Sequence, residues 1–504
     1  RRQRQMCIRD SLYPDLIKRV EFMDEISSFQ EDVARIYHQM LLCQETEKID
    51  KKMREEIIPE MLKNVSSMRN MRFGFEENEE ENDDKNPDWA DAFEQSGLGD
   101  KLREMNELQL EGADVYMSTF AALKSYPFFR EVQNWFYPFS KQQSDVIKQL
   151  KQEGNEKNTL LDLILQSGFF SNSDKYSLFF TIRQLPKAQQ DMMLSQLGEQ
   201  QVAELSEKSN AETMKKFNER PGTVSNQYLH DLYRFFKLSV RRHEFRDIFK
   251  EKLDLHHIPA LNNVLYNEYI LFPIADFYLK KERWNEAIEV YEEMETIGAL
   301  KGRGAEYYQK LGYALQKNKK YAEAIDAYLK ADTLKPDNIW NNRHLAICYR
   351  LNRNYQAALS YYKKVEEATP ESTNVIFHIG SCLAELGQYE EAANYFFKLD
   401  FIESNCIKAW RGIGWCSFIS RKYEQAMKYY EKIIGQKPLA IDYMNAGHVA
   451  WAMGDIQKAA ALYGKSITAN GNRERFLEMF RKDEEALLKQ GIQEEDIPLM
   501  LDLL

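Results

Sequence analysis

Residues 305–338 have the sequence AEYYQKLGYALQKNKKYAEAIDAYLKADTLKPDN, and residues 339–372 continue as IWNNRHLAICYRLNRNYQAALSYYKKVEEATPES. In the first segment Gly312 is followed twelve residues later by Ala324, and four residues after that by Tyr328. The second segment repeats these three positions as Ala346, Ala358 and Tyr362. The two stretches are therefore copies of one structural unit.

The same three positions recur through the C-terminal half of the chain. The alanines, at intervals of 37, 34, 34, 34 and 33 residues, are Ala287, Ala324, Ala358, Ala392, Ala426 and Ala459. The small residues twelve positions earlier are Ala275, Gly312, Ala346, Gly380, Gly414 and Gly447, and the aromatic residues four positions later are Tyr291, Tyr328, Tyr362, Phe396, Tyr430 and Tyr463. A period near 34 is typical of stacked helical hairpins. We predict an all-α fold, an α-α superhelix whose six repeats are 268–304, 305–338, 339–372, 373–406, 407–439 and 440–473.

Packing explains why these residue types recur. Two helices approach closely only where side chains are small, and a residue four positions further along lies on the same helical face. Gly387 and Gly454 stand where the turn between two helices needs a positive φ. In the repeat 305–338 we therefore expect helices over about 305–317 and 321–332. The charged segment 474–504 is expected to form the polar capping helix of the array.

The N-terminal half is predicted to be helical but less regular. We interpret residues 1–11 as a non-native scar, so the true N-terminus and any targeting segment are expected to be missing. Residues 12–75 show helical spacing for two or three amphipathic helices, with a coiled coil as the alternative. The acidic stretch 76–91 is predicted to be a solvated linker, with a docking tail as the alternative.

Three further segments complete this half. Residues 92–157 are predicted to hold a long helix over 100–124, followed by an aromatic cluster over 126–139. These rings are expected to be core between crossing helices, or else a partner groove. Residues 158–267 are predicted to contain degenerate helical repeats, with 229–267 as one of them.

Composition limits the function classes. The 504 residues carry a net charge of −11, so a concentrated basic face for nucleic acid or anionic membranes is not expected. No run of uninterrupted apolar residues reaches the length of a membrane-spanning helix. The six cysteines show no CxxC pair, which predicts a reducing, cytoplasmic location.

The repeated half resembles the tetratricopeptide repeat family, of which we identify the chain as a bacterial-type member. In residues 339–372 the residues that carry this resemblance are Leu345, Ala346, Tyr349, Tyr355, Ala358, Tyr362 and Pro370. The closing proline recurs as Pro336 and Pro438 but is Ser404 in one repeat, and Trp410 matches the family's early tryptophan in the fifth repeat alone. The resemblance implies a non-catalytic scaffold or adaptor.

The resemblance also implies which residues line the concave face, namely certain positions of each first helix. The predicted partner-binding residues are Tyr313, Trp340, Arg343, Arg350, Phe377, Lys408, Arg411, Trp415, His448 and Trp451. The same positions also include Tyr269, Phe272, Gln316, Phe418 and Met444. Aromatic and basic side chains in one groove suit an extended acidic or aromatic peptide. Packing between the repeats is the alternative role for some of these rings.

Some members of the family clamp the C-terminal carboxylate of heat-shock chaperones. Arg343 and Lys408 occupy two of the five clamp positions, whereas Ile347, His378 and Gly412 occupy the other three. The clamp is therefore incomplete, and binding of chaperone tails is not predicted.

No motif indicates catalysis. Cys348, Cys382 and Cys416 recur every 34 residues, but equivalent positions of stacked helices lie about 10 Å apart, too far for a disulfide or a shared zinc ion. The pair His256–His257 lacks further residues at metal-ligand spacing. Gly-rich phosphate loops, GxSxG and HExxH are absent from the sequence. We predict no catalytic residues, no metal and no cofactor.

The predicted function is therefore a non-catalytic scaffold that binds a protein or peptide segment in the concave groove. One alternative is a peptide- or ligand-sensing regulator, which a ligand-dependent change in hydrogen exchange of residues 76–91 would favour. The other is an accessory subunit of an enzyme complex, or an enzyme with a polar cluster in a cleft, for example near His256 and His257. The sequence names neither the partner nor the oligomeric state.

Overall fold

The structure, a computed structural model, describes residues 14–26, 28–57, 108, 112–140, 143, 146, 170–184, 186, 222–298 and 304–504. Within these ranges all regular elements are helices, as predicted, and none is a strand. None of these helices is long and apolar enough to cross a membrane. The predicted segments 1–11 and 76–91, and most of 158–215, lie outside the described residues.

The chain divides into two compact units, Arg1–Asp84 with Asp88–Ile274, and Lys85–Pro87 with Ala275–Leu504. The division falls inside helix α15, Glu268–Lys280. We call them the N-terminal unit and the repeat unit.

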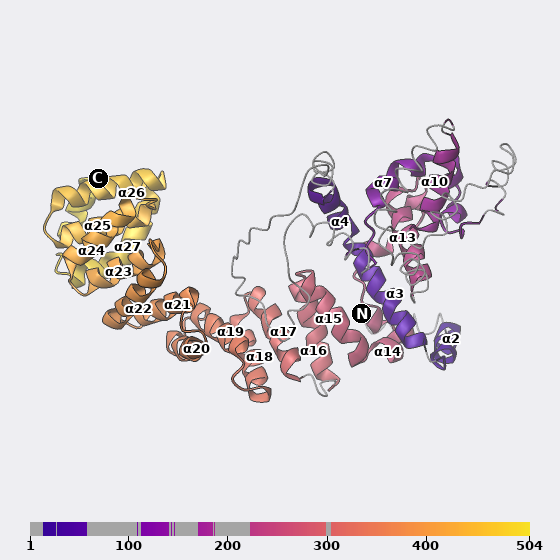
Figure 1. The fold of residues 1–504 in the computed structure, drawn as a ribbon, viewed down its shortest axis with the longest axis horizontal. Coiled ribbons are helices and arrows are strands. Elements are labelled where there is room, and N and C mark those ends of the chain that lie inside the picture. Colours follow the sequence, from indigo (N-terminus) through magenta and orange to yellow (C-terminus); the bar gives the residue numbers. More distant parts are fainter. Residues whose placement is uncertain are drawn as a thin grey trace, which may run out of the picture. The chain divides into compact units, whose positions relative to one another are not determined.

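The repeat unit consists of helices that pack in consecutive pairs (Figure 1). In chain order they are α16 Trp284–Thr296, α17 Gly304–Lys317, α18 Tyr321–Leu334, α19 Ile339–Leu351, α20 Tyr355–Ala368, α21 Thr373–Glu385, α22 Tyr389–Ile402, α23 Ile407–Ile419, α24 Tyr423–Ile434, α25 Ala440–Ala452, α26 Ile456–Asn470, α27 Arg473–Lys489 and α28 Asp496–Asp502. We call α17, α19, α21, α23 and α25 the first helices and α18, α20, α22, α24 and α26 the second helices. The helices expected over 305–317 and 321–332 agree with α17 and α18 to within two residues.

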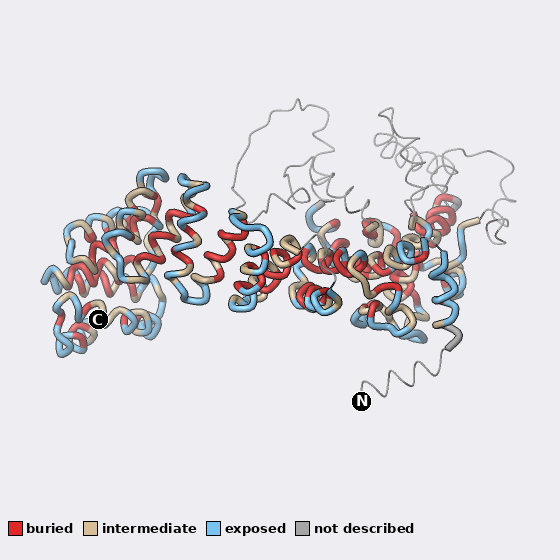
Figure 2. The backbone as a smooth tube through the Cα atoms, turned by 90° about the horizontal axis from the view of Figure 1, so that it is seen from below, coloured by how far each residue is buried: buried red, intermediate tan, exposed pale blue. Residues whose placement is uncertain are grey.

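The recurring small residues are buried where the helices of one hairpin meet. All six alanines of the repeat have no exposed surface, and buried and exposed segments alternate along the helices (Figure 2). A Cβ added to Gly312 would lie 2.8 Å from the ring of Tyr328, and one added to Gly447 would lie 2.5 Å from the ring of Tyr463. The aromatic ring of the second helix thus rests on the backbone of its own first helix, which is why glycine or alanine stands there.

A second set of contacts joins neighbouring repeats through their second helices. Glu366 accepts hydrogen bonds from the Tyr395 hydroxyl at 3.1 Å and the Lys398 ammonium at 2.8 Å, both of the following repeat. Glu295 of α16 accepts hydrogen bonds from Tyr308 of the first helix α17 at 3.0 Å and from Lys330 of the second helix α18 at 2.7 Å. These contacts lie near the surface, so each contributes little energy, but together they fix how successive hairpins stack.

The described helices of the N-terminal unit are shorter and less regular. They are α2 Pro14–Asp24, α3 Phe29–Gln44, α4 Thr46–Lys52, the π-helix η1 Met53–Ile57, α7 Met117–Ala121, α10 Asn172–Gln184, α13 Thr223–Leu238, α14 Pro259–Leu265 and α15. The 3₁₀ helices are η3 Ala122–Ser125, η4 Pro127–Arg130, η5 Val132–Trp135, η6 Arg242–Glu244, η7 Ile248–Lys250 and η8 Leu255–His257. Helices α2 to α4 lie in the segment predicted to hold two or three amphipathic helices.

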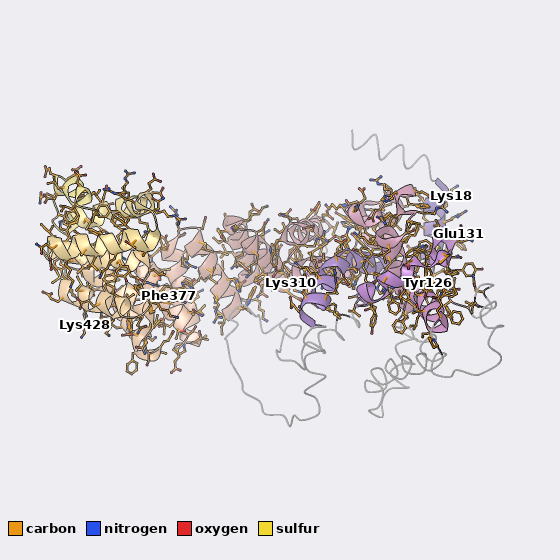
Figure 3. The ribbon with its side chains drawn as sticks, turned by 90° about the horizontal axis from the view of Figure 1, so that it is seen from above. Lys18, Tyr126, Glu131, Lys310, Phe377 and Lys428 are labelled. Carbon is orange, nitrogen blue, oxygen red and sulfur yellow. The ribbon has the colours of Figure 1, made fainter. Side chains whose placement is uncertain are left out.

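The aromatic cluster of residues 126–139 is core except for Tyr137, which is exposed. Phe129 and Trp135 are buried against Tyr176 and Phe180 of α10, and the Trp135 indole donates a hydrogen bond to the Phe129 carbonyl at 2.8 Å. Tyr126, labelled in Figure 3, packs its ring 6.0 Å from that of Phe180. The rings pack mainly among 3₁₀ turns rather than between two long crossing helices.

Two predictions for this unit are wrong. The long helix expected over 100–124 is broken, because Gly112 has φ +94° and Asp114 turns inward to accept the Tyr116 backbone N–H at 3.2 Å. The segment 229–267 is not a helical hairpin. Its second half consists of the 3₁₀ helices η6, η7 and η8 and the short α14, since the alanine that lets two helices cross is replaced by Ile248.

Candidate functional site

The ten predicted partner-binding residues all lie on first helices. Helix α17 carries Tyr313, α19 carries Trp340, Arg343 and Arg350, α21 carries Phe377, α23 carries Lys408, Arg411 and Trp415, and α25 carries His448 and Trp451. Within a helix they recur three, four or seven residues apart, or further multiples of these spacings. Such residues share one face of the helix.

Seven of the ten have surface available to a partner. Lys408 is exposed, and the half-buried residues are Tyr313, Arg343, Arg350, Phe377, Arg411 and Trp415. Half-burial fixes a side chain's direction while leaving its tip accessible, which lowers the entropy lost on binding.

The other three are buried in the packing, so they offer little surface to a partner. Trp340 is 4 % exposed and lies with its ring 4.0 Å from that of His344. His448 is fully buried, and Trp451 stacks on Phe480 of the capping helix α27. The additional concave-face positions differ in burial. Phe272, Phe418 and Met444 are buried, Gln316 is half-buried and Tyr269 is exposed.

Arg411 is held by an ion pair between two repeats. Its Nε and Nη2 donate to the two carboxylate oxygens of Asp442, each at 2.7 Å, and Asp442 is 1 % exposed. The hydrogen bond to Asp442 raises the pKa of Arg411. Because a bidentate pair of this kind already satisfies the guanidinium, Arg411 serves the stacking of α23 on α25 more than the capture of a partner.

The first helices in the middle of the array are basic. Helices α19, α21 and α23 together contain Arg343, Arg350, Lys408 and Arg411, and their one acidic residue is Glu385 at the end of α21. The second helices α18 and α22 contain more acidic than basic residues. In a chain with a net charge of −11, this separation places positive potential on the face of the first helices.

Aromatic side chains accompany these cations. Phe377 of α21 and Trp415 of α23 are half-buried, and the Lys317 ammonium lies 5.0 Å from the ring centre of Tyr313. The ring centre of Trp415 lies 5.6 Å from that of the buried Phe418, and this contact fixes the position of the indole. Rigid aromatic side chains next to arginine are the residue types enriched at binding hot spots.

The incomplete chaperone clamp has a steric cause at one position. An added Cβ at Gly412 would lie 2.5 Å from the ring of Phe396, so no arginine fits there without displacing that ring. At a second position His378 stacks on Tyr362 with the ring centres 5.4 Å apart. The array therefore uses these two positions for packing.

The recurring cysteines are buried, as the packing interpretation predicts. Cys348, Cys382 and Cys416 are at most 1 % exposed, and burial raises the pKa of their thiols to about 12, about 11 and about 12. A thiol with so high a pKa carries almost no thiolate at neutral pH and is inert.

The histidine pair has separate local roles within the N-terminal unit. The His256 ring is 3 % exposed and its Nδ1 lies 2.8 Å from the Tyr37 hydroxyl. His257 is partly exposed, with Nδ1 3.7 Å from the Asp254 carboxylate. His256 is therefore a hydrogen-bonded core histidine.

A buried charge cluster in the N-terminal unit was not predicted from the sequence. The Arg234 guanidinium pairs with Asp114 and Asp174, and the Lys124 ammonium donates to Asp174 at 2.8 Å. Burial raises the pKa of Asp231 and lowers that of Lys124.

This cluster is sealed from solvent. The side chains of Lys124, Asp174 and Arg234 are each at most 2 % exposed, so the cluster offers no path for a substrate. The available sequence signal was the polar run 171–175 between two pairs of phenylalanines. We assign the cluster to stability.

Comparison with known proteins agrees with this architecture. The tetratricopeptide repeat family matches residues 305–338, 345–400 and 443–473. No curated protein matches the chain. Similar solved structures include a tetratricopeptide repeat protein from Parabacteroides merdae, with 20% identity over 46% of this chain and 96% of that one and a TM-score of 0.34. YrrB, described as having an unusual peptide-binding site, shares 20% identity over 37% of this chain and 97% of its own, with a TM-score of 0.32. MamA shares 19% identity over 34% of this chain and 96% of its own, with a TM-score of 0.32.

Paired helices stacked in register and followed by the charged helix α27 define an α-solenoid, a class of protein that presents extended surfaces for interaction. The first matched segment, 305–338, has the same bounds as a predicted repeat, and the last ends at residue 473, where the sixth predicted repeat ends. The segment 345–400 lies within the third and fourth predicted repeats. These segments of the chain are tetratricopeptide repeats.

Proposed function

We propose that this protein is a non-catalytic scaffold that binds an acidic, aromatic-containing protein segment along its first helices. The observation that carries the proposal is the basic character of α19, α21 and α23, where Arg343, Arg350 and Lys408 have accessible surface. Phe377 and Trp415 supply apolar contact beside these cations.

The chemistry of these side chains defines the partner. Arginine pairs with carboxylates through two parallel hydrogen bonds and stacks on aromatic rings, so a segment with Asp or Glu next to Phe, Tyr or Trp fits best. A partner held by surface charges binds more weakly at high salt, since ions screen exposed pairs beyond about 10 Å at 0.1 M. A cytoplasmic location is part of the proposal, because the described cysteines are free thiols.

A pull-down with a charge-reversed variant tests this function. Arg343→Glu combined with Arg350→Glu is expected to lose partners that the wild type captures from lysate, because two attractive charges become repulsive. The captured partners are expected to be released by raising the salt concentration. Identical partner sets from wild type and double variant would refute the proposed binding face.

The chain offers a matched control on its second helices. Lys363 of α20 and Lys428 of α24 are exposed, and Figure 3 labels Lys428 and Phe377 within the repeat unit. Lys363→Glu with Lys428→Glu makes the same change in net charge on the other set of helices. This control is expected to keep the wild-type partners, which separates a local effect from the change in total charge.

A further inference from the structure

A cavity of about 300 Å³ lies within the N-terminal unit. Three helices enclose it. Helix α3 contributes Ala34, Arg35, His38 and Gln39, the start of α13 contributes Gly222 and Asn226, and α15 contributes Tyr269, Ile270, Pro273 and Ile274. This volume is at the lower end of the range found for small-molecule sites.

The polar and apolar residues of the lining come from different helices. Arg35 and His38 lie on α3 and Asn226 on α13, whereas Ile270 and Ile274 lie on α15 and are buried at 6 % and 2 % exposure. Such a division orients a ligand that has an apolar body and a polar end.

The polar residues are arranged by the surrounding backbone. Gln39, 2 % exposed, donates a hydrogen bond to the Gly112 carbonyl at 2.8 Å. A Cβ added to Gly112 would lie 2.5 Å from the Gln39 side-chain oxygen and 3.0 Å from the Asn226 side-chain nitrogen. The missing side chain at Gly112 therefore lets both amides take up their positions at the cavity.

The lining of the cavity contains one cationic side chain, that of Arg35. Among the described residues that line the cavity there is one guanidinium and no carboxylate. Arg35 pairs through Nη2 with Asp32 and, at 3.7 Å, through Nη1 with Glu31, both of which are exposed and outside the lining. The Arg35 Nε is buried without a hydrogen bond to any described residue. Because Asp32 and Glu31 already pair with the two terminal nitrogens of Arg35, its Nε is the donor left for a ligand, and one such donor suits a carboxylate better than a phosphate dianion.

Helix α15 supplies a hydrogen-bond acceptor. Pro273 stands inside α15 and has no N–H, so the carbonyl of Tyr269, four residues earlier, lacks its helical hydrogen bond. Both residues line the cavity, and Tyr269 is 89 % exposed at its edge. A ligand N–H can donate to this carbonyl.

We propose that this cavity binds a small N-acylated aliphatic amino acid. The carboxylate faces Arg35 and Asn226, the N–H donates to the Tyr269 carbonyl, and the aliphatic side chain lies against Ile270 and Ile274. The same chemistry occurs in a free N-acyl amino acid and in the C-terminal residue of a peptide. None of the ten predicted partner-binding residues lines this cavity, so the proposal does not depend on the proposed function.

Calorimetry on the full chain tests the site with N-acetyl-leucine, with N-acetyl-leucine amide and with the tetrapeptide Gly-Gly-Gly-Leu. The acid is expected to bind at least about tenfold more tightly than the amide, because only the acid forms a charge-assisted pair with the guanidinium. Binding of the tetrapeptide but not of the free acid would identify a peptide end as the source. Equal affinity for acid and amide, or binding of none of the three, would overturn the proposal.

Two variants locate the binding. Arg35→Met keeps the length of the side chain and removes its charge, and is expected to lower the affinity for the acid at least about tenfold. Ala34→Leu fills the cavity from α3 with another strong helix former and is expected to abolish binding. Arg54→Met, at an exposed arginine that pairs with Asp50, is the matched control and is expected to bind as the wild type does. Unchanged affinity in Ala34→Leu, with helicity and melting temperature preserved, would refute this location.

Discussion

At the scale of single residues, the turns between first and second helices share one conformation that the sequence only partly reveals. A positive φ recurs at Glu282, Lys319, Arg353, Gly387, Arg421 and Gly454, with spacings that follow the repeat. The sequence predicted Gly387 and Gly454, because glycine marks such positions. The other four were not predictable, since a charged residue with positive φ leaves no local signal.

These non-glycine turns predict a stabilising substitution. Arg353 is exposed with φ +61°, a conformation that costs a side-chain-bearing residue about 1–2 kcal/mol. Arg353→Gly removes that cost but increases the entropy of the unfolded chain, so we expect a net gain of about 0.5–1 kcal/mol. A higher urea midpoint with an unchanged m value would confirm it.

Two further variants check the cause. Arg353→Ala keeps the strained φ and is expected to give no gain, whereas Gly387→Ala introduces the strain and is expected to lower the midpoint. If Arg353→Ala stabilised the protein as much as Arg353→Gly, the loss of the arginine side chain and not the backbone would be responsible.

At the scale of helices, the repeat register predicted which face a residue occupies but not what covers that face. Trp340 and Trp451 stand at the predicted positions of α19 and α25, yet His344 covers one and Phe480 of α27 the other. The period of 34 residues describes contacts that every repeat makes. A contact made once, with a capping helix or a single histidine, has no period and remains invisible until the structure is known.

The capping helix α27 is joined to the last repeat through His448, which predicts a pH dependence. His448 Nδ1 lies 2.7 Å from the Tyr463 hydroxyl of α26, and Nε2 lies 3.4 Å from the Asp483 carboxylate of α27. Burial lowers the pKa of His448 from 6.5, although Asp483 opposes this shift. The folded state therefore binds fewer protons than the unfolded state. The contribution of neutral His448 to the free energy of unfolding is fully present above about pH 6.5. It falls by about 1.4 kcal/mol for each pH unit between that value and the lowered pKa.

Hydrogen exchange along α27 at pH 7.5 and pH 5.5 measures this effect. Protection is expected to decrease at pH 5.5 in the wild type and to stay constant in His448→Gln, which does not titrate. His243→Gln, an exposed histidine of the N-terminal unit, is expected to behave as the wild type. Equal loss of protection in wild type and His448→Gln would assign the pH dependence to another group.

At the scale of the whole molecule, the two units differ in how far the sequence predicts them. In the repeat unit each contact recurs in several copies, so the fold follows from the period. In the N-terminal unit Arg234 meets Asp114 and Asp174, which are 120 and 60 residues away in a sequence without repeats. The cavity beside Arg35 and Asn226 likewise joins helices distant in the chain. Such sites can be found only in the structure, because no recurring spacing in the sequence indicates them.

The same difference predicts that the units respond separately to the loss of a buried charge. Arg234→Met removes the cation that Asp114 and Asp174 share, leaving Asp114 without its cation at 3 % exposure and Asp174, at 1 % exposure, with Lys124 alone. We expect the N-terminal unit to lose about 3–5 kcal/mol. Hydrogen exchange resolved by segment is expected to show α10 and α13 deprotected, while α19 to α24 keep wild-type rates. Arg241→Met, at an exposed ion pair with Glu244, is expected to leave both units unchanged. Deprotection of the repeat helices by Arg234→Met would mean that the two units unfold as one, since the array would then depend on a charge cluster that none of its own helices supplies.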